Sequence, residues 1–179
     1  MNVFFLDKNP TESAHMHCDK HVVKMILEYA QLLSTAHRIL DGELYIDNSS
    51  GRRIKRWKLN NNLCENTLYK ATHINHPSAV WARESKQNYN WLYESFASLC
   101  SEYTLRYGKI HATQTKLEKY LKYAPKNISD IAFTEPPQAM PEYCRIENDS
   151  VQAYRKYYIN EKANMLRYTK REKPQWIIL

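Results

Sequence analysis

The stretch "HMHCDKHVVKMILEYAQLLSTAHRIL", His15 to Leu40, contains the longest helical pattern in this sequence. Its apolar residues recur around most of a helix with about 3.6 residues per turn, so we expect a helix that packs on several sides. Thr11 is the expected N-cap, and Asp41-Gly42 is expected to end the helix. One polar stripe follows steps of 4, 3, 4, 3 and 4 residues and consists of His17, His21, Lys24, Glu28, Gln31 and Thr35.

The rest of the chain also favours a mainly α fold. Only 3 of the 179 residues are glycine, whereas sheet-rich folds need regular turn residues between short strands. We therefore predict a single compact helical domain, 1–179, with a short extended segment at Val3–Leu6. Pro77 is expected to begin the second long helix and Gly108 to end it. The expected helices cover residues 11–40, 63–71, 78–107, 113–123 and 150–168, and the two longest should pack together at the centre.

Three segments lack a helical pattern. Residues 43–62 read as a basic loop or a weak hairpin, residues 125–148 as a proline-containing connection, and residues 169–179 as a basic, aromatic tail. The loop carries five cations that form a candidate nucleic-acid surface: Arg52, Arg53, Lys55, Arg56 and Lys58.

Composition narrows the functional classes. A formal net charge of +7 favours polyanionic partners such as DNA or a nucleotide. The four cysteines form no C-x-x-C pair, so we expect reduced thiols and a cytoplasmic location. No apolar run approaches the roughly 20 residues of a membrane-spanning helix, and we predict no membrane partner. Nothing in the sequence indicates a cofactor.

Two interpretations of the polar stripe compete. It is either the solvent face of the helix or one wall of a pocket, and two histidines one turn apart favour the pocket. His17 and His21 also form an H-x-x-x-H pair that suits zinc, but Lys24 would repel a cation, so we assign no metal. Cys18 beside His17 is a poor candidate nucleophile, because adjacent helical residues point about 100° apart.

A second group of candidate residues lies in "THINHPSAVWARESKQNYNWLY", Thr72 to Tyr93. His73 and His76 precede a helix, where free backbone N–H groups favour a phosphate. Candidate base-stacking, phosphate and base-edge contacts are Trp81, Arg83, Asn88 and Trp91. Alternatively, Trp81 belongs to the core and His76 only caps the helix. We predict that the stripe residues from His17 to Glu28 face His73, His76 and Arg83.

The segment "DKHVVKMILE", Asp19 to Glu28, resembles a segment near the amino end of the phage pyrimidine-dimer DNA glycosylases. In that family a histidine precedes the catalytic glutamate by seven residues, as His21 precedes Glu28. The stretch "NEKANMLRYTKREKPQW", residues 160–176, is similar to the family's C-terminal segment, and the whole chain is similar to small proteins of tailed-phage genomes. Two family arginines are replaced, by Leu27 and Gln31. The family's nucleophile is the α-amine of a threonine exposed by removal of Met1, whereas Asn2 should retain Met1.

This resemblance implies a DNA glycosylase-like hydrolase that excises a base. Glu28 would stabilise the oxocarbenium-like sugar. Lys24 would be the amine that captures this sugar, if burial makes the amine a better nucleophile. His17 and His21 complete the candidate catalytic set. The alternative is a protein that binds and sequesters a nucleotide or nucleotide-derived signal without cleaving it. A third possibility is an interaction protein whose stripe is a solvated face.

Overall fold

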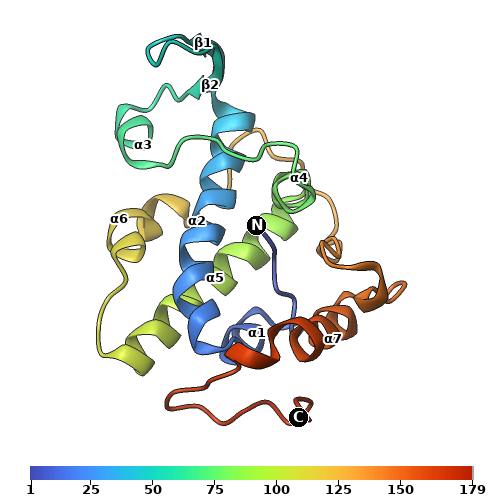
Figure 1. The fold of residues 1–179 in the computed structure, drawn as a ribbon. Coiled ribbons are helices and arrows are strands. Elements are labelled where there is room, and N and C mark those ends of the chain that lie inside the picture. Colours follow the sequence, from blue (N-terminus) through green and yellow to red (C-terminus); the bar gives the residue numbers. More distant parts are fainter. Residues whose placement is uncertain (179) are drawn as a thin grey trace.

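Helix α2, Asp19–Asp41, runs through the centre of the computed structural model, which describes residues 1–178 (Figure 1). Helix α5, Lys86–Tyr107, packs along it, as expected for the two longest apolar segments. Helix α1, Pro10–His15, packs on α5, and helices α4, Pro77–Glu84, and α6, Ala112–Leu121, pack on α2. The protein is compact and mainly helical, which confirms the predicted fold class.

Both long helices are interrupted, which corrects the predicted boundaries. Residues 16–18 separate α1 from α2, and α1 is capped by Asn9, whose side chain accepts hydrogen bonds from Thr11 N and Glu12 N. The N-cap is therefore not Thr11. Ser85 separates α4 from α5, because its hydroxyl donates to Ile131 O at 2.7 Å and accepts from Gln87 N. Nothing near Ser85 in the sequence indicates this contact.

The basic segment forms a hairpin, so the weak-hairpin alternative is correct. Strands β1, Glu43–Asp47, and β2, Ile54–Lys58, are antiparallel, with Glu43 opposite Lys58. Helix α3, Asn62–Thr67, follows directly. Figure 1 shows the hairpin projecting beyond the end of α2.

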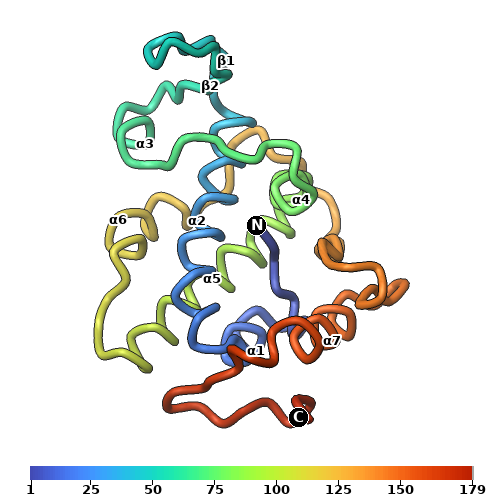
Figure 2. The backbone as a smooth tube through the Cα atoms, viewed as in Figure 1, coloured from blue at the N-terminus to red at the C-terminus, as the bar shows by residue number. Residues whose placement is uncertain are grey.

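The C-terminal third begins with the proline-containing connection, residues 125–148, which runs from α6 past α4 to α7 (Figure 2). It contains one 3₁₀ turn, Glu142–Cys144. Asp149 caps helix α7, Ser150–Lys162, by accepting from Gln152 N. Helix α7 ends before the predicted residue 168, since a 3₁₀ turn, Ala163–Met165, follows it.

The N-terminal segment is extended and buried but pairs with no strand among the described residues. Two of its backbone N–H groups donate hydrogen bonds to side-chain hydroxyls instead: Phe4 N donates to Tyr29 Oη at 3.1 Å, and Leu6 N donates to Ser13 Oγ at 3.1 Å. These contacts hold the amino end of the chain beside α2 and near the start of α4 (Figure 1).

Candidate functional site

His17 lies in the break between α1 and α2 and is fully buried. Its Nδ1 is 2.7 Å from Ser13 O, and its Nε2 has no hydrogen-bond partner among the described residues. Burial lowers the pKa of His17 to about 4. The ring is therefore neutral at neutral pH and has no access to a ligand.

His21 is in the first turn of α2 and belongs to the same buried cluster. Its ring stacks on Phe4 with centroids 4.3 Å apart, and its Nδ1 is 2.5 Å from Tyr158 Oη. Burial lowers the pKa of His21 to about 3, with further lowering by the charges of His17, Lys162 and Lys24. The interpretation of the stripe as a pocket wall is thus wrong at its first two positions, because aromatic side chains cover both histidines.

Solvent reaches three residues of the stripe, Gln31 and the ion pair formed by Lys24 and Glu28. The paired residues are one turn apart on α2, and Lys24 Nζ is 3.2 Å from Glu28 Oε1. The Lys24 side chain is 64% exposed, whereas that of Glu28 is 15% exposed. The burial that would make Lys24 a stronger nucleophile is therefore absent, but the amine is open to an incoming molecule.

The start of α4 lies close to this pair. His76 is the N-cap, and its Nδ1 accepts from Ser78 N at 3.2 Å, as the capping alternative predicted. Burial lowers the pKa of His76, the α-amino group of Met1 and His73 lower it further, and Glu28 raises it. Glu28, His73 and the amino end therefore lie close enough to His76 for their charges to shift its pKa. These four groups form one neighbourhood.

His73 is held at the rim of this neighbourhood by its backbone. It has a positive φ of 49°, and its Nδ1 is 2.8 Å from Thr72 Oγ1. The last stripe residue, Thr35, is buried and lies against the same loop, where its Oγ1 accepts from Thr72 N at 3.3 Å. The stripe is therefore neither wholly solvated nor wholly inside a pocket.

The remaining residues predicted on α4 and α5 use their polar groups within the protein. Trp81 Nε1 donates to Thr134 O at 2.8 Å, and Trp91 Nε1 donates to Lys8 O at 2.8 Å. Asn88 donates to Trp81 O and Thr134 Oγ1 and accepts from Thr134 N. Two of these residues thus hold the 125–148 connection, and Trp91 holds the loop before α1.

Arg83 also turns toward its own helix. One guanidinium N–H group donates to Ala79 O at 2.7 Å, and burial lowers the pKa of Arg83. This bond gives Arg83 a partner in α4 itself, one turn nearer the start of the helix.

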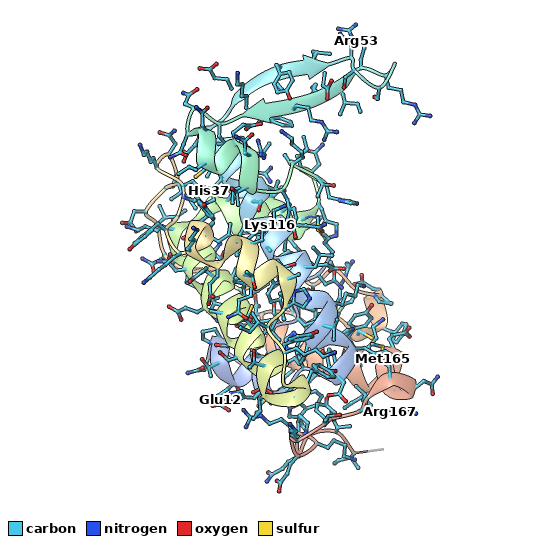
Figure 3. All side chains as sticks on the ribbon, turned by 90° about the vertical axis from the view of Figure 1, so that its left-hand side faces the viewer. Glu12, His37, Arg53, Lys116, Met165 and Arg167 are labelled. Atoms are coloured by element: carbon cyan, nitrogen blue, oxygen red, sulfur yellow. The ribbon has the colours of Figure 1, made fainter. Side chains whose placement is uncertain are left out.

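The five predicted surface cations lie on the hairpin and the turn between its strands. Arg53 is at the outer end of the molecule (Figure 3), and Arg52, Arg53, Lys55 and Lys58 are exposed. Arg56 is half-buried, with its Nε 3.8 Å from Asp47 Oδ2. The hairpin therefore presents a cationic edge with two carboxylates, Glu43 and Asp47, on strand β1.

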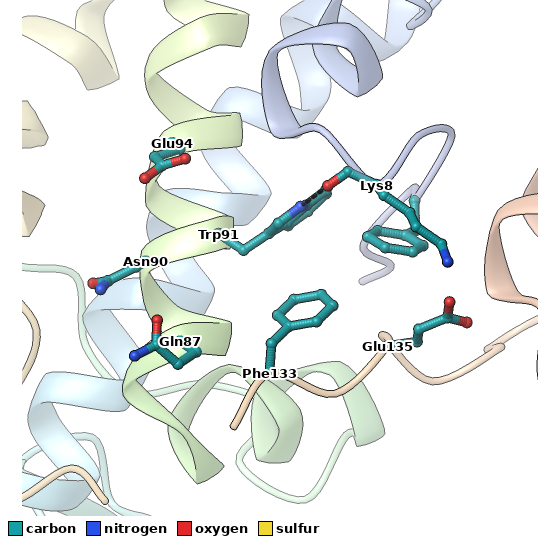
Figure 4. Close-up of a pocket in the computed structure, with 8 residues that line it drawn as sticks. Lys8, Gln87, Asn90, Trp91, Glu94, Phe133 and Glu135 are labelled. Carbon is teal, nitrogen blue, oxygen red and sulfur yellow. Dashed lines mark hydrogen bonds between the residues drawn. The ribbon is translucent and has the colours of Figure 1, made fainter. Parts of the chain in front are cut away.

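An open groove beside α5 was not anticipated from the sequence. Phe5, Trp91 and Phe133 form its apolar floor, and Glu94 and Glu135 lie at its rim (Figure 4). The Phe5 and Trp91 ring centroids are 4.9 Å apart. Three distant segments build this groove, so no local motif could reveal it.

No protein-family model matches the chain, and neither the curated proteins nor the solved structures include a match. Within residues 1–178, no helix is both long and apolar enough to cross a membrane. The same residues contain no group of three or more His, Cys, Asp or Glu side chains placed to hold a metal ion.

Proposed function

We propose that this protein acts on nucleic acid as a glycosylase-like base-excision enzyme whose reacting pair is Lys24 and Glu28. The observation that carries the proposal is the 3.2 Å contact between an exposed amine and a shielded carboxylate. Such enzymes need an amine to capture C1′ of the sugar and a carboxylate to stabilise positive charge on the sugar ring. The pair supplies both groups at one place on the surface of α2.

The surroundings of the pair favour an anionic substrate. The positive charges of Lys24 and Lys162 lower the pKa of His21, and the α-amino group of Met1 lowers the pKa of His76. The negative charge of Glu28 has the opposite effect and raises the pKa of His76. This excess of positive charge would attract a phosphodiester backbone and so bring a sugar of the strand toward the Lys24–Glu28 pair.

The reaction would begin with attack of the unprotonated Lys24 nitrogen on C1′. The bond between C1′ and the base breaks, its electron pair leaves with the base, and the base takes a proton from solvent. Glu28 stabilises the oxocarbenium-like sugar and accepts the proton released by the amine. When the C1′–O4′ bond opens, its electron pair goes to O4′, which takes the proton held by Glu28, and the nitrogen lone pair forms the C=N bond of a protonated imine between Lys24 and the sugar.

Borohydride trapping tests this proposal directly. The protein is incubated with labelled undamaged and ultraviolet-irradiated duplex DNA in the presence of sodium borohydride, and adducts are located by peptide mass spectrometry. We expect a DNA adduct on Lys24 that Lys24→Gln and Glu28→Gln both abolish, while the exposed neighbour Lys20→Gln retains it. An adduct on the Met1 amine would overturn the role of Lys24. The absence of both an adduct and released base would contradict the enzymatic proposal.

The hairpin supports a long nucleic acid as the substrate. Each phosphate neutralised by a bound cation contributes a slope of about −0.9 to the plot of log K against log salt concentration for duplex DNA. Replacement of Arg52, Arg53, Lys55 and Arg56 by glutamine should weaken binding and flatten this slope. Glutamine at four exposed cations elsewhere, Lys20, Lys109, Lys156 and Lys173, is the charge-matched control. Equal slopes for the two variants would exclude the hairpin as the DNA contact.

The second candidate is a protein that sequesters a nucleotide without cleaving it. The observation in its favour is the 64% exposure of Lys24, since the amine lacks the burial that would activate it. A sequestering protein would return its ligand unchanged after denaturation. Tight capture of a mononucleotide, without adduct or released base, would support this candidate over the enzyme.

A further inference from the structure

A cavity of about 400 Å³ lies at the foot of the hairpin, away from the Lys24–Glu28 pair. His37 is one of its lining residues, and it lies between the hairpin end of the molecule, marked by Arg53, and helix α6, marked by Lys116 (Figure 3). His37 and Glu28 are nine residues apart on α2, which is two and a half turns, so they face opposite sides of that helix. The cavity is thus separate from the candidate catalytic pair.

The walls of this cavity combine aromatic rings with side-chain amides. Tyr120 and Tyr123 come from the end of α6 and the turn after it, Asn61 follows strand β2, and Asn127 begins the proline-containing connection. Asn61 Oδ1 accepts from Cys64 N, and Asn127 Nδ2 donates to Leu40 O. Both amides are therefore held in place, with one amino group and one carbonyl oxygen left to offer a ligand.

Each of the two tyrosine rings has a lysine over it. Lys119 Nζ is 4.8 Å from the centroid of the Tyr120 ring, and Lys122 Nζ is 5.9 Å from that of Tyr123. Lys126 also lines the cavity. The opposing carboxylate, Asp41, is occupied by hydrogen bonds from Lys126 N and Asn127 N at 2.9 and 3.0 Å. Lysines therefore lie at the rim, whereas the interior combines aromatic rings and amides with one carboxylate, Asp41, whose oxygens accept backbone hydrogen bonds.

We propose that this cavity binds a nucleobase of a single-stranded nucleic acid. Tyrosine rings provide stacking surfaces, the amides of Asn61 and Asn127 provide a donor and an acceptor for a base edge, and the lysines attract the adjoining phosphates. Leu59–Asn61, which line the cavity, follow strand β2, so three of the hairpin cations, Lys55, Arg56 and Lys58, precede the cavity closely in the chain. The choice of nucleic acid as the ligand class rests on the proposed function. The inference does not depend on the excision chemistry.

Cys64 provides a reporter inside the cavity. It is half-buried and lines the cavity, whereas Cys18, Cys100 and Cys144 are fully buried. A thiol reagent added to the native protein should therefore modify Cys64 first, and Cys64→Ser should remove that reaction. Protection of Cys64 then measures occupation of the cavity.

The experiment measures the rate of Cys64 alkylation under three conditions: with a thymidine octanucleotide, with an abasic octanucleotide of the same charge, and without any oligonucleotide. We expect the base-containing strand to slow alkylation at least severalfold and the abasic strand to leave it nearly unchanged. Tyr123→Leu should weaken protection about tenfold, since one base–aromatic stack is lost. Tyr123 is 73% exposed, so its replacement should not unfold the protein. The matched control is Tyr143→Leu at another exposed tyrosine, 55% exposed.

Equal protection by the two strands, or none by either, would overturn the nucleobase site. The result is separable from the proposed function because trapping on Lys24 is measured independently. An adduct on Lys24 without protection of Cys64 would overturn only this inference. Protection of Cys64 without an adduct would support the cavity and count against the enzyme.

Discussion

At the scale of single residues, the buried imidazoles couple the fold to pH. Burial lowers the pKa of His17 to about 4, of His21 to about 3 and of His37 to about 4. An unfolded chain has ordinary imidazoles with a pKa near 6.5, so it binds more protons than the folded protein below about pH 6.5. The neutral rings therefore stabilise the fold above that pH, and their contribution is lost as the pH falls toward 4.

We expect the free energy of unfolding to decrease as the pH falls from 6.5 to 4.5, by up to about 1.4 kcal/mol per pH unit for each buried imidazole. Glu65, whose pKa is about 2, contributes only in a lower window, below about pH 4.5. Urea denaturation of the wild type and His37→Asn at several pH values measures the effect. The variant should show a smaller pH slope, and a wild-type stability that is constant from pH 7 to 5 would contradict the prediction.

At the scale of elements, Arg38 attaches the hairpin and α3 to α2. Its side chain is fully buried and donates to four carbonyl oxygens, those of Trp57, Glu65, Leu68 and Tyr69, and to Glu65 Oε2 at 2.6 Å. Burial acts to raise the pKa of Glu65, but hydrogen bonds from Lys70, Leu59 N and Arg38 lower it to about 2. One guanidinium group therefore holds the whole segment that carries the cationic edge.

Arg38→Met should destabilise the protein by about 3–5 kcal/mol, because it leaves a shielded carboxylate and several carbonyl groups without their partner. The control is Arg145→Met, which breaks an exposed ion pair of 2.7 Å with Glu142 and should cost about 1 kcal/mol or less. Urea denaturation followed by circular dichroism compares the two variants. Similar losses would show that the Arg38 network does not hold the hairpin segment.

At the scale of the whole molecule, the C-terminal tail is clamped to the central helices by charge. Glu102 of α5 is 2% exposed and pairs with Arg106 at 2.9 Å and with Arg171 of the tail at 2.5 Å. Asp19, at the start of α2, accepts from Thr169 N and Oγ1 and pairs with Arg106 at 3.0 Å. These bonds join three segments that are distant in sequence.

We expect Arg106→Gln to cost about 3–5 kcal/mol, since it leaves Glu102 without its buried partner. Arg171→Gln should cost about 1–3 kcal/mol, because the Arg171 side chain is 34% exposed and Arg106 still pairs with Glu102. Arg171→Gln should also speed proteolysis of residues 169–178 while α5 stays resistant. An unchanged rate of tail cleavage would show that the Glu102–Arg171 pair does not hold the tail.

Local sequence determined the helical class and several helix ends. The second long helical segment ends at Gly108, with φ of 66°, and Asp149 caps α7, because such positions depend on backbone conformation and nearby side chains alone. The alternation of apolar and polar residues on α2 also follows from its helical period. The sequence likewise identified the basic segment, as a loop or a weak hairpin, and the Lys24–Glu28 spacing.

Only the tertiary structure decided which polar residues are accessible. The period of a helix sets the face on which His21 lies, but Phe4 and Tyr158 cover that face, and Tyr158 is 137 residues away in the chain. The break at Ser85 likewise depends on the carbonyl group of Ile131. The cavity beside Cys64 gathers residues from α2, the hairpin end, α3, α6 and the connection after it. Long-range packing determines such contacts, and no local pattern of residues records them.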